Sequence, residues 1–186
     1  MKKTLFPIIL FSLIIAGCAK DKSQNPFAVK KHGVGLINDS TQIKDLKTIF
    51  SNDSISNYKE DDSFTGRINT IEIFEKGSSN PLLVITPTEA LDSTATISSI
   101  RLIDSRYKTD KNISVISTFK DIKEAYKINK ITNLINSVLV SVNELDATFT
   151  IDKKELPANM RYDLDLKIDA IQIPDDAKLK FFMVHF

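Results

Sequence analysis

The sequence lacks most of the residues on which metal and cofactor chemistry depends. Among 186 residues there is no tryptophan, one cysteine, two histidines and five glycines. One cysteine allows no disulfide within the chain, and two histidines with one thiol are too few for a four-ligand zinc site. The glycines are too scattered to form a phosphate-binding loop. We therefore expect no cofactor and no metal.

The charge balance argues against a nucleic-acid partner. Lysine and arginine together number 25, and aspartate and glutamate 24, whereas nucleic-acid-binding proteins usually carry a basic excess. If residues 1–17 are removed as a signal peptide, 23 basic and 24 acidic side chains remain. The mature chain would therefore be close to neutral.

The N-terminus has the pattern of a secretory signal peptide. Lys2 and Lys3 precede an almost continuously apolar run of 11 residues, from position 5 to position 15. A membrane-spanning helix needs about 20 residues, so this run is too short to cross a bilayer. Its length fits the apolar segment of a signal peptide instead.

The end of this segment resembles the lipobox of bacterial lipoproteins. The residues Ile15-Ala16-Gly17-Cys18 are an aliphatic residue and two small residues followed by a cysteine. We expect cleavage between Gly17 and Cys18, with residues 1–17 as the signal peptide and Cys18 lipidated. The alternative is an ordinary signal peptide followed by a chance cysteine. Lipidation is favoured because the chain's only cysteine stands where a lipobox requires it.

The residues after the cysteine bear on location. By the same resemblance, Ala19 in place of an aspartate implies an outer-membrane lipoprotein, on the periplasmic face or on the cell surface. The membrane would be a partner through the N-terminal lipid. Residues 18–31 are expected to form a flexible tether, because they are polar, contain Pro26 and have no periodic apolar pattern.

Residues 32–186 are expected to form a single α+β domain, mostly antiparallel sheet with two short helices. Residues 41–50 and 117–126 share apolar positions at i, i+3, i+6 and i+7, the pattern of one helix face. Thr41 and Ser117 stand where a hydroxyl could cap each helix. The match predicts two tandem strand-helix-strand repeats, about 32–110 and 111–186, although two similar amphipathic helices can also arise by chance.

Several β-rich segments are expected to be strands. Residues 34–37 and 113–116 precede the helices, and hairpins are predicted from 68–74 with 82–86 and from 138–142 with 147–151. Residues 97–104 resemble residues 168–175, and each would close one repeat. The last strand, 178–186, is apolar on both sides, which predicts that the rest of the domain covers both its faces.

Histidines and carboxylates are the candidate catalytic groups. His32 and His185 could each act as a base, although a lone histidine more often has a structural role. A carboxylate-dependent hydrolase needs two acids across a groove, one of them with a raised pKa. Acids near one another in the sequence are Glu60 with Asp61 and Asp62, Glu72 with Glu75, Asp163 with Asp165, and Asp175 with Asp176. Their spacing selects no pair, so we assign no catalytic residue.

Together these segments resemble a family of small uncharacterised Gram-negative outer-membrane lipoproteins that is described as a domain of unknown function. The motifs concerned lie at 32–35, 41–50, 68–74, 97–105 and 119–122. The resemblance implies an envelope location and an α+β fold, and it brings no catalytic residues.

The sequence leaves three functions open. The first is a non-enzymatic envelope lipoprotein that binds a protein or a cell-wall component. The second is an inhibitor of an envelope or host hydrolase, and the third is a hydrolase that uses paired carboxylates.

Overall fold

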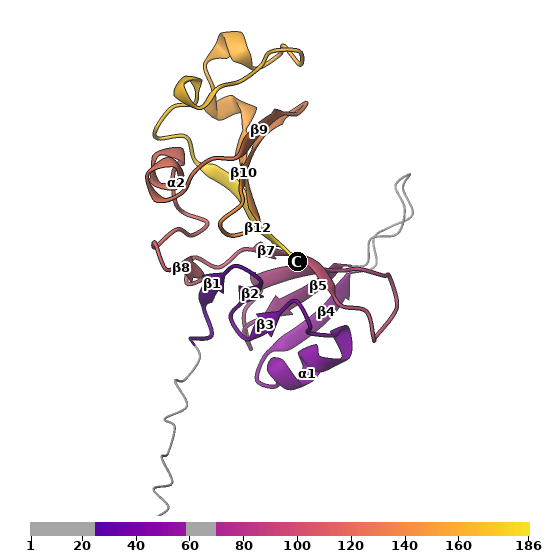
Figure 1. The fold of residues 1–186 in the computed structure, drawn as a ribbon. Coiled ribbons are helices and arrows are strands. Elements are labelled where there is room, and N and C mark those ends of the chain that lie inside the picture. The colour runs from indigo at the N-terminus through magenta and orange to yellow at the C-terminus, as the bar shows by residue number, and fades with distance from the viewer. Residues whose placement is uncertain (1–24, 59–69) are drawn as a thin grey trace, which may run out of the picture.

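The computed structural model describes residues 25–58 and 70–186 (Figure 1). In these residues an eight-stranded antiparallel sheet has the order β4-β5-β6-β7-β12-β11-β10-β9, and a smaller sheet has the order β3-β2-β1-β8. The sheet-dominated α+β class is confirmed. The strands of the large sheet are β4 (Ser54–Tyr58), β5 (Thr70–Phe74), β6 (Pro81–Pro87), β7 (Ile97–Leu102), β9 (Lys130–Asn133), β10 (Ser137–Val142), β11 (Ala147–Asp152) and β12 (Leu179–His185).

The remaining elements are short. The small sheet contains β1 (Ala28–Lys30), β2 (Gly33–Val34), β3 (Ile37–Asn38) and β8 (Lys108–Thr109). The α-helices are α1 (Leu46–Ile49), which continues the 3₁₀ turn η1 (Ile43–Asp45), and α2 (Phe119–Ala125). Three further 3₁₀ turns, η2 (Lys153–Glu155), η3 (Ala158–Met160) and η4 (Ala170–Gln172), precede the last strand.

The large sheet is built from two meanders of four strands that meet at its centre. β4 to β7 form one half, β9 to β12 form the other, and β7 pairs antiparallel with β12. This arrangement relates the halves by an approximate two-fold axis that passes between the opposed residues Arg101 and Met183. Each half carries a register shift at the equivalent place, between Thr86 and Pro87 and at Thr150.

The helices repeat the same relation to the sheet. Gln42, at the start of η1, forms an isolated bridge with Thr96, which directly precedes β7. Thr118, at the start of α2, forms the same bridge with Lys178, which directly precedes β12. The two halves therefore share a topology in which a helix is followed by four strands, which differs from the strand-helix-strand unit predicted from the sequence.

The helices begin one residue later than predicted. Gln42 and Thr118 are the N-cap residues, and an aspartate three residues on accepts from each backbone N–H at 3.1 and 2.7 Å. Thr41 and Ser117 accept instead from the backbone N–H three residues before them, at 3.0 and 3.1 Å. The prediction of these two as caps is wrong, because a hydroxyl can satisfy the preceding turn as well as a helix.

Both strands predicted ahead of the helices are wrong. Residues 34–37 contain the tight turn between β2 and β3. Gly35 in this turn has a φ of +60°, and a Cβ there would lie 2.3 Å from the carbonyl oxygen of Pro26, so a glycine is required. Residues 113–116 belong to no strand, and 115–116 form a turn. Each apolar run was too short to distinguish a strand from a buried turn.

The second half closes differently from the prediction. Residues 168–175 contain η4, and the strand equivalent to β7 is β12. The connection from β11 to β12 spans 153–178, whereas its counterpart in the first half spans 88–96. The similarity of 168–175 to 97–104 consists of apolar spacing alone, which a 3₁₀ turn can share with a strand.

The domain begins earlier than predicted. β1 lies within the segment expected to be a tether, and it pairs antiparallel with β2 and parallel with β8. The predicted tether, 18–31, therefore extends too far at its C-terminal end. Residues 18–24 of that segment lie outside the described residues, as do Gly17 and Cys18.

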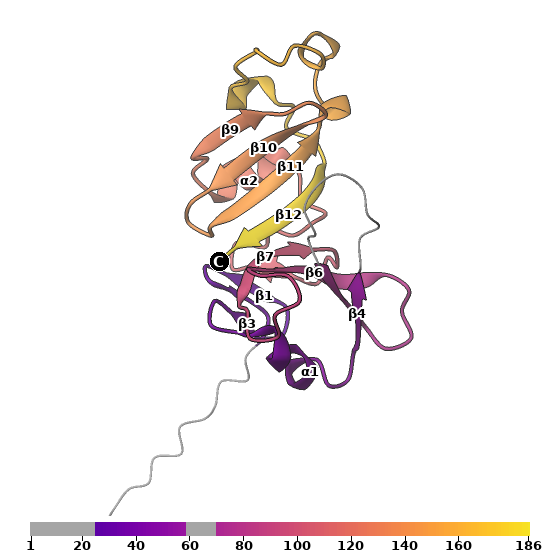
Figure 2. The same ribbon diagram turned by 90° about the vertical axis from the view of Figure 1, so that its right-hand side faces the viewer.

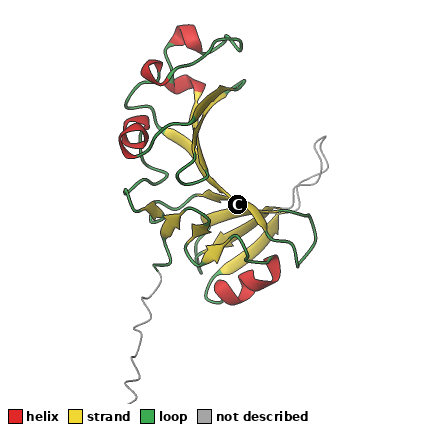
Figure 3. Ribbon diagram, in the orientation of Figure 1, coloured by secondary structure: helices red, strands yellow, loops and turns green. Residues whose placement is uncertain are grey.

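Within the described parts of the chain, the α-helices cover one face of the large sheet. In Figure 2, α2 lies behind β10, β11 and β12, and Figure 3 shows both α-helices on the outer side of the bend between the two halves. Phe182 and Val184 point to the helix-covered face and are fully buried. Phe181 and Met183 point to the opposite face and are half-buried. The expectation that both faces of the last strand are covered is therefore wrong.

We predict that neighbouring phenylalanines of β12 differ strongly in their contribution to stability. Phe182 is fully buried and stacks on Phe149 at 4.5 Å between ring centroids, so Phe182→Ala should lower the free energy of unfolding by about 3–5 kcal/mol. Phe181→Ala on the open face is the control and should cost less than about 2 kcal/mol. Urea unfolding measures both, and equal losses would contradict this assignment of the faces.

Candidate functional site

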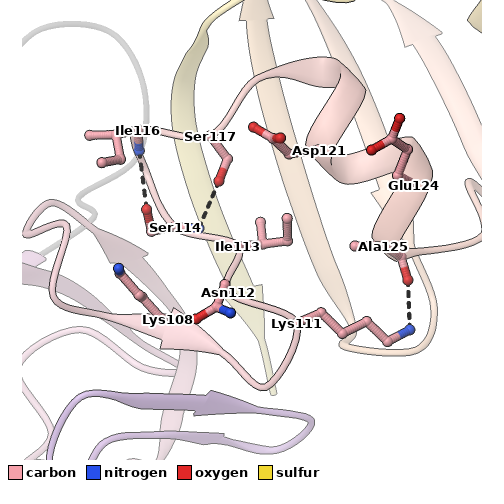
Figure 4. A pocket seen from close by; sticks show the side chains of 10 residues that line it. All are labelled: Lys108, Lys111, Asn112, Ile113, Ser114, Ile116, Ser117, Asp121, Glu124 and Ala125. Carbon is pink, nitrogen blue, oxygen red and sulfur yellow. Dashed lines mark hydrogen bonds between the residues drawn. The ribbon is translucent and has the colours of Figure 1, made fainter.

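A cavity of about 710 Å³ lies between α2 and the connection that follows β8 (Figure 4). Its lining combines lysines, carboxylates, hydroxyls and aliphatic side chains: Lys108, Lys111, Asn112, Ile113, Ser114, Ile116, Ser117, Asp121, Glu124 and Ala125. All of these residues belong to the second half of the chain. Such a mixed polar lining suits a polar ligand better than an apolar one.

Local hydrogen bonds shape the wall of the cavity opposite the helix. Thr109 accepts at its carbonyl oxygen from Asn112 N at 3.0 Å and at Oγ1 from Ile113 N at 3.1 Å. Asn112 has a φ of +62°, a left-handed conformation that asparagine tolerates. Ser114 Oγ then accepts from Ile116 N at 3.4 Å, so the turn satisfies much of its own backbone.

Lys111 fixes the end of α2. Its Nζ donates to the carbonyl oxygen of Ala125 at 2.6 Å and to Glu144 Oε2 at 3.0 Å, and it lies 4.3 Å from the ring centroid of Tyr126. Figure 4 shows the side chain extended toward Ala125. A cation at a helix C-terminus satisfies a free carbonyl and opposes the helix dipole. The hydrogen bond from Lys111 also lowers the pKa of Glu144.

The two carboxylates of the cavity do not form a hydrolase pair. Asp121 and Glu124 are both exposed. Asp121 accepts from the backbone and hydroxyl of Thr118 at 2.7 and 3.0 Å, and Glu124 lies 3.8 Å from Lys120. A carboxyl that acts as a general acid needs burial to raise its pKa, and neither of these is buried.

The acid pairs noted in the sequence are dispersed over the surface. Glu75 binds Arg106, Asp175 pairs with Lys123, and Asp163 and Asp165 lie together in an exposed loop. Glu72 projects from the helix-free face of β5, opposite Ser56 and Val84. Glu60, Asp61 and Asp62 lie outside the described residues. The structure therefore brings no pair of these described acids together across a groove.

The two histidines lie around one turn. His185 Nε2 is 2.9 Å from Thr148 Oγ1, and its backbone N donates to the carbonyl of Asp146 at 2.8 Å. His32 Nε2 lies 3.7 Å from the carboxylate of Asp146, which also pairs with Lys31 at 3.2 Å. Burial lowers the pKa of His185, and Asp146 opposes that shift.

The pairing of Thr148 with His185 was not foreseen from the sequence. A hydroxyl and an imidazole at this distance have the geometry of a nucleophile and its base. Among the described residues no carboxylate accepts a hydrogen bond from the His185 ring, so these residues do not supply the third, orienting group of a triad. The contact links β11 to β12.

A cluster around Arg106 holds the N-terminal strand against the domain. The guanidinium makes a bidentate contact with Glu75 at 3.0 and 3.1 Å, and it contacts Asp104 Oδ2 at 2.9 Å. It also stacks over Phe27, 4.6 Å from the ring centroid, and Phe27 packs edge-on against the buried Tyr107. Phe27 directly precedes β1, so this cluster fixes the point where the chain enters the fold.

Among residues 25–58 and 70–186, no group of three His, Cys, Asp or Glu side chains is placed to hold a metal ion. No helix in the same ranges is long and apolar enough to cross a bilayer.

We predict that the two lysines of the cavity differ in their structural roles. Lys111→Met removes the contacts with Ala125 and Glu144, and it should lower the free energy of unfolding by about 1–2 kcal/mol. Lys108→Met is the matched control, because the Lys108 ammonium has no hydrogen bond or ion pair to a described residue. Its effect should stay within roughly 0.5 kcal/mol. Equal losses in urea unfolding would contradict the role of Lys111.

We predict that Asp104 makes stability depend on acid pH. The hydrogen bond from Arg106 lowers the Asp104 pKa below its ordinary 3.8, so the ionised form favours folding. That stabilisation should be complete above about pH 4 and be lost as the pH falls through the lowered value. Asp104→Asn should lose less stability than the unaltered chain between pH 6 and pH 2 in urea titrations. Parallel losses would refute the prediction.

The comparisons with known proteins identify a fold and no family. No family model and no curated protein matches the chain. The fold is similar to that of the solved structure of the uncharacterized protein yfeY from Escherichia coli, with a TM-score of 0.58 and 16% sequence identity. The match covers 86% of this chain and 99% of that chain. At this identity the similarity shows the fold alone.

Proposed function

We propose that this chain is a bacterial envelope lipoprotein whose domain is a non-enzymatic binding module. The observation that carries the proposal is the sequence Ile15-Ala16-Gly17-Cys18, in which the only cysteine of the chain follows a signal-like segment. A peptidase would cut between Gly17 and Cys18, and Cys18 would become the lipidated N-terminus. Ala19 supports an outer-membrane location.

Acyl chains on Cys18 would be enough to hold the protein at a membrane. Each buried methylene contributes about 0.8 kcal/mol, and two acyl chains hold a protein stably where one does so only marginally. The chain enters the domain beside Phe27 and β1, at the end remote from β9 and β10 (Figure 1). An anchor at this end would leave β9 to β12 free to meet a partner.

The arrangement of polar groups supports binding over catalysis. The carboxylates of the α2 cavity are exposed and engaged in capping or in an ion pair. The hydroxyl of Thr148 and the ring of His185 have no orienting carboxylate among the described residues. A fold that presents a cavity and an uncovered sheet face offers two surfaces for recognition.

We predict that Cys18→Ser releases the protein from the membrane. The unaltered chain should enter the detergent phase and carry acyl chains on Cys18 by mass spectrometry, whereas Cys18→Ser should stay in the aqueous phase. Adding Ser23→Cys to Cys18→Ser is the matched control. It restores a thiol five positions away, outside the lipobox, and should not restore anchoring. An unmodified Cys18, or equally firm attachment of Cys18→Ser, would refute the proposal.

A further inference from the structure

No helix or strand of residues 25–58 and 70–186 covers the centre of the large sheet on the face opposite the helices. The pairing places one transverse row of residues on this face, and the row runs Ser56, Glu72, Val84, Arg101, Met183, Thr148, Ser141 and Lys130. A neighbouring row contains Phe181, Thr150, Leu139 and Thr132. Figure 2 shows this face of β9 to β12 turned to the viewer with no helix over it.

Arg101 is the central residue of this face. It lies beside the approximate two-fold axis, directly between Val84 of β6 and Met183 of β12. Its guanidinium stacks over Phe181 at 5.0 Å from the ring centroid. It has no hydrogen bond or ion pair to any residue in 25–58 or 70–186.

Other arginines in the described structure have polar partners. Arg106 contacts two carboxylates, and Arg161 Nε donates to the carbonyl oxygen of Leu156 at 2.8 Å. A half-buried guanidinium on an apolar bed keeps its five donors available for an incoming group. The group that matches its planar fork best is a carboxylate, which it can bind in a bidentate fashion.

The open face carries a small excess of positive charge. Arg101, Lys130 and Lys180 are positive. Glu72, which lies beyond Val84 in the same row, and Asp152, which Lys180 binds at 3.1 Å, are negative. The half-buried Phe181, Met183 and Leu139 lie between these cations. Arginine and large apolar residues at the centre of a polar rim are the composition of protein-binding hot spots.

We propose that this surface, the Arg101 face (Arg101, Lys130, Leu139, Phe181 and Met183), docks an acidic segment of a protein partner. A carboxylate of the partner would pair with Arg101, and an adjacent apolar side chain would pack on Phe181 and Met183. The face lies on the inside of the bend between the halves of the sheet (Figures 1 and 3). A convex protein segment fits such a surface, whereas a flat bilayer does not. The proposal names the partner class of the binding module proposed above, and it does not require the lipid anchor.

Site-specific photocrosslinking of the full chain, in the cells that make it, tests the proposal. The probe is p-benzoylphenylalanine placed at Phe181, and the matched control places it at Ile116, which is 75% exposed on the rim of the α2 cavity. We expect a discrete adduct from position 181 that is absent from position 116. Mass spectrometry of the adduct should map the crosslink to a partner segment that contains aspartate or glutamate.

Charge reversal then tests the role of Arg101. Arg101→Glu should reduce the adduct roughly tenfold or more, whereas Arg101→Lys should retain most of it. Replacing the mapped carboxylate of the partner with arginine should restore the adduct of Arg101→Glu. Thermal unfolding of each variant shows whether the fold persists. Lys130→Glu, at an exposed position on the rim, is a second variant that should weaken the adduct without touching the core.

The alternative occupants have distinct outcomes, and each would overturn the proposal. These outcomes are no adduct, an adduct with lipid, an adduct with a second copy of this chain, a mapped segment without carboxylates, or an adduct that charge reversal leaves unchanged. If only the lipid-anchor proposal is wrong, Cys18 will be unmodified and the adduct from position 181 will still form. The two failures are therefore distinguishable.

Discussion

The pairing of β7 with β12 is the constraint on which the rest of the structure depends. These strands come from opposite halves of the chain and are joined by four residue pairs, from Leu102 with Phe182 to Ser99 with His185. Their antiparallel contact turns two separate meanders into one sheet and places the helices of both halves on the same face. It also lets Ile100 and Val184 meet in a shared core. Neither half alone could bury the helix-covered side of its strand at this β7–β12 junction. The two halves therefore form one domain.

The sequence predicts local elements well where they are periodic. The two helices and the two hairpins follow from apolar spacing and β-branched content, and the structure places them within a few residues of prediction. The failures have a common cause, since 34–37, 113–116 and 168–175 are short apolar runs whose burial depends on distant contacts. The residues next to Gly35 do not indicate that a side chain at this position would clash with the carbonyl oxygen of Pro26. β4 and β9, polar strands at the sheet edges, gave no signal at all.

The candidate surfaces were harder to foresee than the fold. Lys111, Glu144 and Ala125 meet through a contact between residues far apart in the sequence, and Thr148 becomes the partner of His185 only once β11 and β12 pair. Arg101 stands in a strand with no sequence feature to mark it. Within the described structure Arg101 has no carboxylate partner, because strand pairing places a valine and a methionine on either side of it.

The approximate symmetry explains why Arg101 can be central and unpaired. Residues on a two-fold axis face their own equivalents, so a dimer of identical halves would place two arginines in direct opposition, where like charges destabilise a cross-strand pair. One continuous chain removes this restriction, because its two halves can differ in sequence. Met183 occupies the position equivalent to Arg101 and lies directly opposite it. The seam that builds the core therefore also permits one cation at the centre of the open face, without a second to repel it.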